Sequence, residues 1–157
     1  MIELRPANCK ELALLWELRT RAVAHACASH YSAAVLAAWL AAPAPDSLRR
    51  HVAHGGGTVA IEDGSLLGYA VLDAVGGEVD AVFVEPAQQG RGVGAMLMDA
   101  IETAALAAGH KRLFLSASLN AVPFYQRAGF AAVREELYPH RSGVAIPSVY
   151  MEKRLNR

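Results

Sequence analysis

The stretch Val79–Gly94 limits what this chain can fold into more than any other part of the sequence. It reads as an apolar strand, a bend at a proline, and three glycines at alternate positions, Gly90, Gly92 and Gly94, that open a helical pattern. Glycines at such a junction let the backbone turn tightly, and the helix N-terminus offers unpaired N–H groups and a positive dipole end to an anion. No Ser, Thr, Asp or Asn stands among these glycines to cap the helix. The stretch therefore predicts a phosphate-binding loop between a strand and a helix.

Two other phosphate-binding glycine motifs fit this loop less well. A Walker loop requires Gly-Lys-Ser or Gly-Lys-Thr, and neither triplet occurs in the chain. A dinucleotide fingerprint would place its third glycine three residues after Gly92, where Ala95 stands. Alanine is allowed there, but that motif belongs to a first βαβ unit near a domain start, with an acidic residue about 20 positions further on.

The loop instead resembles the acetyl-CoA-binding loop of the GNAT superfamily of N-acetyltransferases. The family's pattern is Gln or Arg, two residues, Gly, one residue, then Gly or Ala, after the fourth strand. Gln89, Gly92 and Gly94 match it completely, and Val84-x-Pro86 precedes them. The resemblance implies that the pyrophosphate of coenzyme A binds here.

The apolar periodicity on both sides of the loop predicts the remaining elements. In the first half, a strand is expected at Ile2–Arg5. Three helices should follow: from Asn8 to about Ala24, from Ser32 to before Pro43, and a short one that begins at a cap formed by Asp46 or Ser47. Three strands should follow at Thr58–Glu62, Leu66–Val75 and Glu78–Val84, joined by tight turns of one kind at Asp63-Gly64 and Gly76-Gly77.

After the loop, the expected elements are a helix from Gly94 to Gly109, a strand at Leu113–Leu115, a short helix from Ser118 or Asn120 to Gly129, and strands at Phe130–Leu137 and Val144–Met151. Strand, helix and strand at this spacing imply a parallel crossover. The order β-α-α-β-β-β-α-β-α-β-β predicts an α/β protein with a mixed sheet. It resembles the GNAT fold over essentially the whole chain.

Composition favours one folded domain over residues 1–157. Hydrophobic residues make up 54% of the chain, which suits a sizeable core and disfavours disorder. Fifteen basic residues balance fifteen acidic ones without a basic run, so no nucleic-acid partner is expected. The apolar stretch Ala33–Ala42 is too short to span a bilayer, and the first residues do not form a signal peptide. A cytoplasmic protein without a membrane partner is expected.

Neither the cysteines nor the histidines predict a metal site. Cys9 and Cys27 show no metal or redox spacing, so reduced core residues are expected, with a disulfide as the alternative. His51-x-x-His54 lacks a third ligand at the spacing of a zinc site.

The stretch Asn120–Phe130 resembles the second cofactor motif of GNAT proteins, an Asn followed by aromatic residues including Tyr and then by Gly-Phe. The resemblance implies that Asn120 lies along the pantetheine arm and that the Tyr125 hydroxyl lies beside the cofactor sulfur. Amide formation expels a thiolate, and a phenol within hydrogen-bond reach can donate a proton to it. Taken alone, the same residues also fit a helix N-cap and a core aromatic.

In GNAT proteins the strand before the loop splays from the next strand, and its free peptide groups pair with pantetheine. The resemblance assigns this role to Phe83 and Val84, and it assigns the cofactor loop to Gln89, Gly90, Arg91, Gly92, Val93 and Gly94. Arg91 either adds charge near the phosphates or is a solvated side chain of which only the backbone N–H takes part.

An attacking amine must be neutral, so a base or a water chain is expected. Glu78, eleven residues before the loop glutamine, resembles the position of the glutamate base in the histone-acetylating branch. Alternation places Asp80 on the same strand face as Glu78 and Val82, and Glu85 follows the strand as a weaker candidate. A solvated carboxylate at Glu78, with ordered water in place of a base, is the alternative.

The connection between the first two helices helps to form the acceptor site in GNAT proteins. His30 and Tyr31 lie in this connection and are candidates for binding the acceptor, whereas Trp39 is expected in the core. The resemblance implies an acceptor that is a small-molecule or peptide amine, and it leaves a homodimer open.

The expected function is N-acetylation by direct attack of a primary amine on acetyl-CoA. Neither Cys9 nor Cys27 is expected near the cofactor motifs, so no covalent enzyme intermediate is expected. Two alternatives remain: a non-catalytic coenzyme A-binding or regulatory module on the same fold, and transfer of a longer acyl group.

Overall fold

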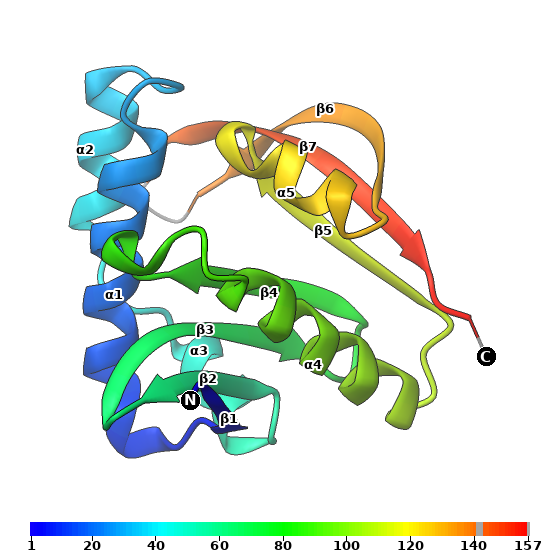
Figure 1. Ribbon diagram of the computed structural model, residues 1–157. Coiled ribbons are helices and arrows are strands. Elements are labelled where there is room, and N and C mark those ends of the chain that lie inside the picture. The colour runs from blue at the N-terminus through cyan, green and yellow to red at the C-terminus, as the bar shows by residue number, and fades with distance from the viewer. Residues whose placement is uncertain (141–142, 157) are drawn as a thin grey trace.

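The computed structural model describes residues 1–140 and 143–156 and contains a seven-stranded mixed sheet (Figure 1). The strands are β1 (Glu3–Pro6), β2 (Gly57–Glu62), β3 (Ser65–Asp73), β4 (Glu78–Val84), β5 (Arg112–Ser118), β6 (Ala131–Pro139) and β7 (Ala145–Arg154). The α-helices are α1 (Leu12–Cys27), α2 (Ala33–Ala41), α3 (Asp46–Ala53), α4 (Val93–Ala107) and α5 (Val122–Arg127), with 3-10 turns η1 (Cys9–Glu11), η2 (Pro86–Gln88) and η3 (Leu119–Ala121). The spatial order β1-β2-β3-β4-β5-β7-β6 confirms the predicted α/β fold.

Polar residues set the start of the N-terminal helices. Asn8 accepts a backbone N–H at 2.9 Å in a capping box, and Ser32 caps α2. The prediction of a side-chain cap at Asp46 or Ser47 is wrong, because Pro45 holds the cap position of α3 and no side chain caps it. Asp46 is the first helical residue, where its charge faces the positive end of the helix dipole.

The two hairpins of the middle strands turn differently. Asp63 (φ 52°) and Gly64 (φ 78°) are both left-handed, as the tight two-residue turn predicted there requires. The prediction of the same turn between β3 and β4 is wrong. That connection spans residues 74–77, and Asp73 Oδ1 accepts from two of its N–H groups at 3.1 Å each, so the aspartate builds a longer turn.

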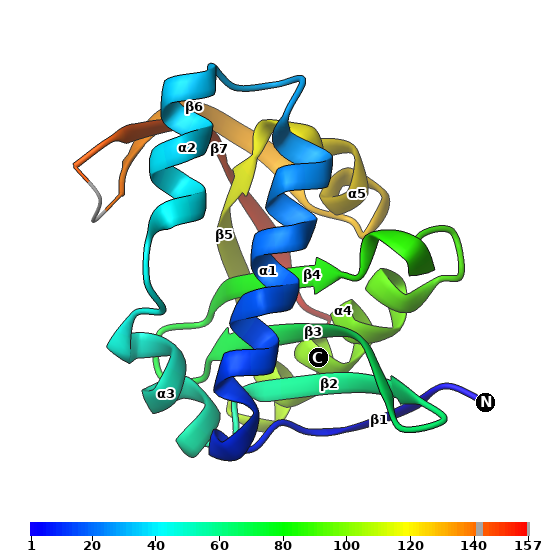
Figure 2. The same ribbon diagram turned by 90° about the vertical axis from the view of Figure 1, so that its left-hand side faces the viewer.

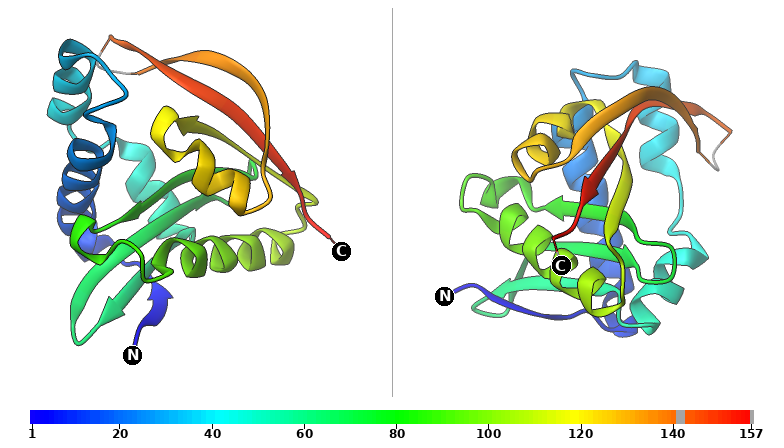
Figure 3. Two further views of the ribbon diagram at one scale, coloured as in Figure 1. Left: turned by 45° about the horizontal axis from the view of Figure 1, so that its top comes forward. Right: turned by 90° about the vertical axis from the view of Figure 1, so that its right-hand side faces the viewer.

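Two hydrophobic cores lie on opposite faces of the sheet. Helices α4 and α5 cover one face, with α4 along β3 and β4 and α5 against β5 (Figures 1 and 3). Helices α1 and α3 cover the other face, and α2 packs on α1 (Figure 2). The buried residues of α4 recur at helical spacing: Val93, Leu97, Met98, Ile101 and Ala105.

The sheet opens between its two central strands. β4 and β5 run parallel, as predicted, but they pair only at Glu78 with Phe114. Beyond this pair the strands diverge toward their C-terminal ends (Figures 1 and 3). The β5-facing edge of β4 therefore has no strand partner from Val79 to Val84 in the described structure.

None of the helices within residues 1–140 and 143–156 combines the length and apolar character needed to cross a membrane.

Candidate active site

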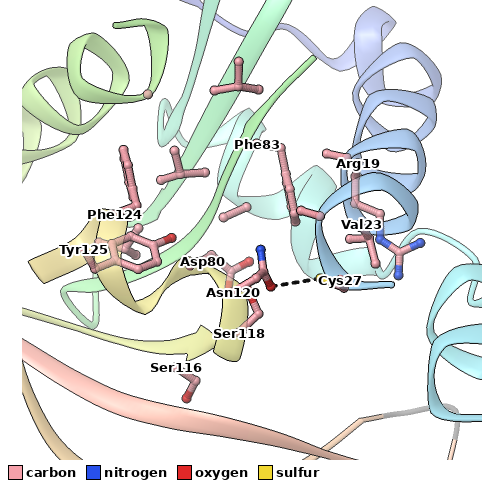
Figure 4. A pocket seen from close by; sticks show the side chains of 18 of the residues that line it. Arg19, Val23, Cys27, Asp80, Phe83, Ser116, Ser118, Asn120, Phe124 and Tyr125 are labelled. Carbon is pink, nitrogen blue, oxygen red and sulfur yellow. Dashed lines mark hydrogen bonds between the residues drawn. The ribbon is translucent and has the colours of Figure 1, made fainter. Parts of the chain in front are cut away.

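A cavity of about 1070 Å³ occupies the opening between β4 and β5 (Figure 4). Its walls come from α1, α2, both diverging strands, the glycine loop, α5 and the β6–β7 hairpin. Segments far apart in the sequence therefore meet here because the central strands separate. The cavity contains residues of both sequence motifs.

The open edge of β4 forms one wall of this cavity. Phe83 and Val84 both line it, as predicted for the strand before the loop. Gln89 lies at the end of this wall, and its Nε2 is 3.5 Å from the carbonyl oxygen of Val84. Peptide groups on a buried strand edge need partners, and an extended ligand with amide groups can supply them.

The glycine loop presents an open helix N-terminus. Gly92 is the cap residue of α4 (φ 77°), and no side chain caps this helix. Gly90 is also left-handed (φ 83°), and an added Cβ at either position would meet no heavy atom within 4 Å. The loop therefore has room for a ligand above unpaired N–H groups. A phosphate fits this chemistry.

Arg91 and Val93 belong to the loop, but neither side chain lines the cavity. The Arg91 guanidinium donates to Glu62 at 2.8 and 3.0 Å and to Gln88 at 2.7 Å. Val93 is 1% exposed and packs in the core under α4. Both residues can meet a ligand through their backbone N–H groups.

Gly94 has a different physical role from the two glycines before it. An added Cβ would lie 2.8 Å from Cε1 of Phe124 in α5. Glycine at this position therefore lets the start of α4 and the ring of Phe124 approach closely. This approach brings the two sequence motifs together.

Tyr125 lies in the middle of α5 with its hydroxyl toward the cavity (Figure 4). Its ring packs edge-on against Phe124 and Phe130, with centroid distances of 5.1 and 5.8 Å. Burial raises the pKa of its phenol, so the group stays protonated at neutral pH. Its hydroxyl forms no hydrogen bond with any residue that the structure describes, and it can therefore donate one to a ligand.

Asn120 meets Cys27 across the cavity. The Cys27 thiol donates to Asn120 Oδ1 at 3.0 Å, so Asn120 is not a helix cap; Ser118 precedes η3 instead (Figure 4). Burial raises the pKa of Cys27 to about 11, which keeps it a thiol. The expectation that neither cysteine lies near the cofactor motifs is therefore wrong for Cys27. Because the Cys27 thiol bonds Asn120 Oδ1, the NH₂ group of the same amide stays available to the cavity.

Glu78 and Asp80 both line the cavity at the start of β4. Burial raises the pKa of Glu78, and the charges of Asp80 and Asp73 add to this. Burial also raises the pKa of Asp80, opposed by His51 and reinforced by Asp73. A carboxylate with a raised pKa is a better proton acceptor, so either residue has the chemistry of a general base.

A β-bulge at Asp80 overturns the prediction that it shares a strand face with Val82. Ala81 pairs with Val71 and Val79 pairs with Leu72, so Asp80 is the extra residue in β4. The bulge resets the alternation, and Val79 and Val82 both pack on the α4 side of the sheet. Such an insertion leaves no trace in a simple apolar pattern.

Glu85, the weaker candidate for the base, lies outside the cavity lining. Its carboxylate forms a two-point ion pair with Arg21 of α1, at 2.9 and 2.7 Å. This pair connects the end of β4 to α1.

Only one of the two residues predicted to bind the acceptor lines the cavity. His30 is exposed and lines the cavity, whereas Tyr31 does not. The Tyr31 hydroxyl donates to the carbonyl of Pro147 at 2.6 Å and accepts from the N–H of Leu119 at 2.9 Å, joining the α1–α2 connection to β7 and η3. Trp39 lines the cavity and is half-buried, where a core position was predicted.

Several polar residues that the motifs do not single out also line the cavity. Arg19 of α1 is 2% exposed; its guanidinium donates to the Trp39 carbonyl at 2.6 Å and lies 4.1 Å from the centroid of Trp16. Ser116 and Ser118 of β5 and Ser148 of β7 are also among them. The alternation of β5 between buried apolar residues and serines could have pointed to the first two.

Within the described residues, no three His, Cys, Asp or Glu side chains come together in an arrangement that could hold a metal ion.

Comparisons with known proteins agree with this geometry. A sequence model described as an acetyltransferase (GNAT) domain matches residues 27–155. The GCN5-related N-acetyltransferase of Rhodopseudomonas palustris is 28% identical, with a TM-score of 0.85 over 98% of this chain and 95% of that one. No curated protein matches the sequence.

Two more distant solved structures share the fold. The PaiA N-acetyltransferase of Thermoplasma acidophilum, solved with coenzyme A, is 20% identical (TM-score 0.78; 98% and 99% of the two chains covered). YncA of Salmonella typhimurium, solved with acetyl-CoA, is 21% identical (TM-score 0.70; 100% and 95% covered). The family model covers most of this chain and the fold agrees throughout, so the protein belongs to the GNAT acetyltransferase family.

Proposed function

We propose that this protein is an N-acetyltransferase that transfers the acetyl group of acetyl-CoA to a primary amine by direct attack. The observation that carries the proposal is the opening between β4 and β5, whose cavity is lined both by the uncapped N-terminus of α4 and by Tyr125. Two proteins of the same fold were solved with coenzyme A or acetyl-CoA, which supports this choice of donor.

The described residues suit the parts of the donor. The N–H groups from Gly90 to Gly94 suit its pyrophosphate, with Arg91 and Val93 acting through their backbone. The free edge at Phe83 and Val84 suits the pantetheine amides. Asn120 can add an amide N–H from the opposite side, and Gln89 lies where the strand ends.

The chemistry needs three proton transfers. Glu78, or Asp80 beside it, accepts a proton from the acceptor ammonium and leaves a neutral nitrogen lone pair. The nitrogen bonds to the acetyl carbon and releases its second proton to solvent, and the carbon–sulfur bond breaks with its electron pair moving to sulfur. Tyr125 donates its proton to that sulfur, and solvent returns a proton to the phenolate. Acetyl-CoA supplies an activated thioester carbonyl.

A thermal-shift measurement tests the donor. Acetyl-CoA at about 1 mM should raise the melting temperature, because a ligand that binds only the folded state stabilises it in proportion to ln(1 + [L]/Kd). NAD and ATP at the same concentration should not. Arg91→Ala should keep the shift, since its guanidinium contacts Glu62. Absence of a shift with acetyl-CoA and with longer acyl-CoA esters would contradict the proposal.

A further inference from the structure

The acceptor end of the cavity carries two carboxylates that form no ion pair within residues 1–140 and 143–156. Glu78 and Asp80 lie on β4, and neither forms a hydrogen bond or an ion pair with any described residue. His51 of α3 is the positively chargeable group that acts on Asp80, and it does so through its charge, without a hydrogen bond or an ion pair. A cationic ligand would supply the missing charge.

The opposite wall of the same space consists of hydroxyl groups. Ser118 on β5 and Ser148 on β7 are directly paired residues, and Ser116 lies two positions earlier on β5. Ser148 is 4% exposed, and its Oγ has no hydrogen-bond partner in the described structure. Because a buried hydroxyl without a partner is costly, this oxygen points to a ligand that donates a hydrogen bond.

Of the described residues, two arginines line the cavity, and neither forms an ion pair with Glu78 or Asp80. The Arg19 guanidinium is directed toward α2, where it donates to Trp39 O and stacks on Trp16 (Figure 4). Arg127 is exposed in the last turn of α5. Within the described part of the chain, an acceptor carboxylate held next to the reacting amine would therefore face Glu78 and Asp80 instead of a guanidinium.

From these observations we propose that the acceptor is a primary amine with no carboxylate on the carbon that bears the nitrogen. It enters as an ammonium ion between the carboxylates of β4 and the serine hydroxyls of β5 and β7. This inference rests on the proposed function, because it identifies the acceptor of the same site. An alkyl or aryl-alkyl amine fits it, and a free α-amino acid does not.

Binding of matched amine pairs tests the inference independently of turnover. Tyramine and L-tyrosine differ by one carboxylate, as do 1,4-diaminobutane and L-ornithine. Calorimetric titration of each into the protein saturated with coenzyme A should give at least about tenfold tighter binding for the decarboxylated member of one pair or both, because like charges repel in a partly buried site. Equal or tighter binding of both amino acids would overturn the inference, and so would binding of none of the four.

Two variants and their two controls locate the residues responsible for this selection. Asp80→Asn should reduce the ratio of the two affinities within a pair by removing repulsion of the amino acid, and Ser148→Ala should weaken the amine about tenfold. Asp99→Asn and Ser65→Ala, both exposed and outside the cavity, are the matched controls. An unchanged ratio in Asp80→Asn together with unchanged amine affinity in Ser148→Ala would overturn the inference. A wild-type protein that does not bind coenzyme A would instead contradict the proposed function.

Discussion

Tyr125 shows at the residue scale how one side chain can belong to the core and still present a polar group to the cavity. The ring lies in the core between Phe124 and Phe130, while the hydroxyl is directed into the cavity without a hydrogen-bond partner among the described residues. Burial disfavours the phenolate and so raises the pKa of the phenol. The residue is thus a core aromatic whose hydroxyl is also placed for the proton donation that we propose.

Tyr125→Phe should lower kcat by about 10²-fold, the range expected for loss of a positioned general acid. The KM for acetyl-CoA should change little, because the phenol acts on the leaving sulfur. Steady-state kinetics on the purified variant measures both constants. Tyr150→Phe is the control, since its hydroxyl bonds Glu152 outside the cavity lining. An unchanged kcat would remove the acid role.

Cys27 should affect donor binding through Asn120. Cys27→Ala removes the donor that holds the Asn120 amide, so the KM for acetyl-CoA should rise about fivefold, the typical effect of one hydrogen bond. Cys27→Ser keeps a donor and should recover part of this loss. Equal KM values in both variants, with melting temperatures recorded separately, would show that the contact does not orient the amide.

At the scale of elements, the contact between α4 and α5 decides how the two cofactor motifs meet. The glycine pattern predicted a loop with room for a phosphate, and Gly90 and Gly92 have that open geometry. Gly94 is glycine for another reason, because Phe124 occupies the space where its side chain would be. The sequence contains both kinds of glycine in one motif and cannot distinguish them.

Gly94→Ala should destabilise the protein by about 1–2 kcal/mol, because the overpacking cost exceeds the gain in helix propensity. In a Phe124→Leu background the same change should be neutral or stabilising, since a smaller side chain leaves room for the methyl group. Chemical denaturation of the four proteins of this double-mutant cycle measures the coupling. Equal free-energy changes in both backgrounds would mean that Phe124 does not impose the glycine.

At the scale of the whole molecule, local patterns predicted nearly every element but few of the contacts between them. The fold order, the open turn at Gly92 and the position of Tyr125 follow from periodicity and two motifs. The bulge at Asp80 does not follow from these patterns, because one inserted residue shifts the side chains after it to the other face of the strand without changing the composition. The bond from Cys27 to Asn120 joins residues 93 positions apart, and only packing creates it.

The acceptor end of the cavity shows the same limit. Glu78 was predicted from its distance to the loop, whereas Ser148 comes from the last strand and reaches the cavity only because β5 pairs with β7. Tyr31 was predicted to bind the acceptor, and its hydroxyl instead joins Pro147 to Leu119. The positions of side chains that come from distant strands are fixed only when the whole sheet has assembled, so local sequence patterns do not predict them.

The release of free thiol from acetyl-CoA, measured with and without an amine, tests the central claim most directly. A panel containing tyramine, 1,4-diaminobutane, amino acids and peptide N-termini should yield at least one amine that accelerates thiol release, with one acetylated amine formed for each thiol. Tyr125→Phe should slow the same reaction. Binding of acetyl-CoA without amine-dependent thiol release across the panel would contradict the account and favour a coenzyme A-binding module without catalysis.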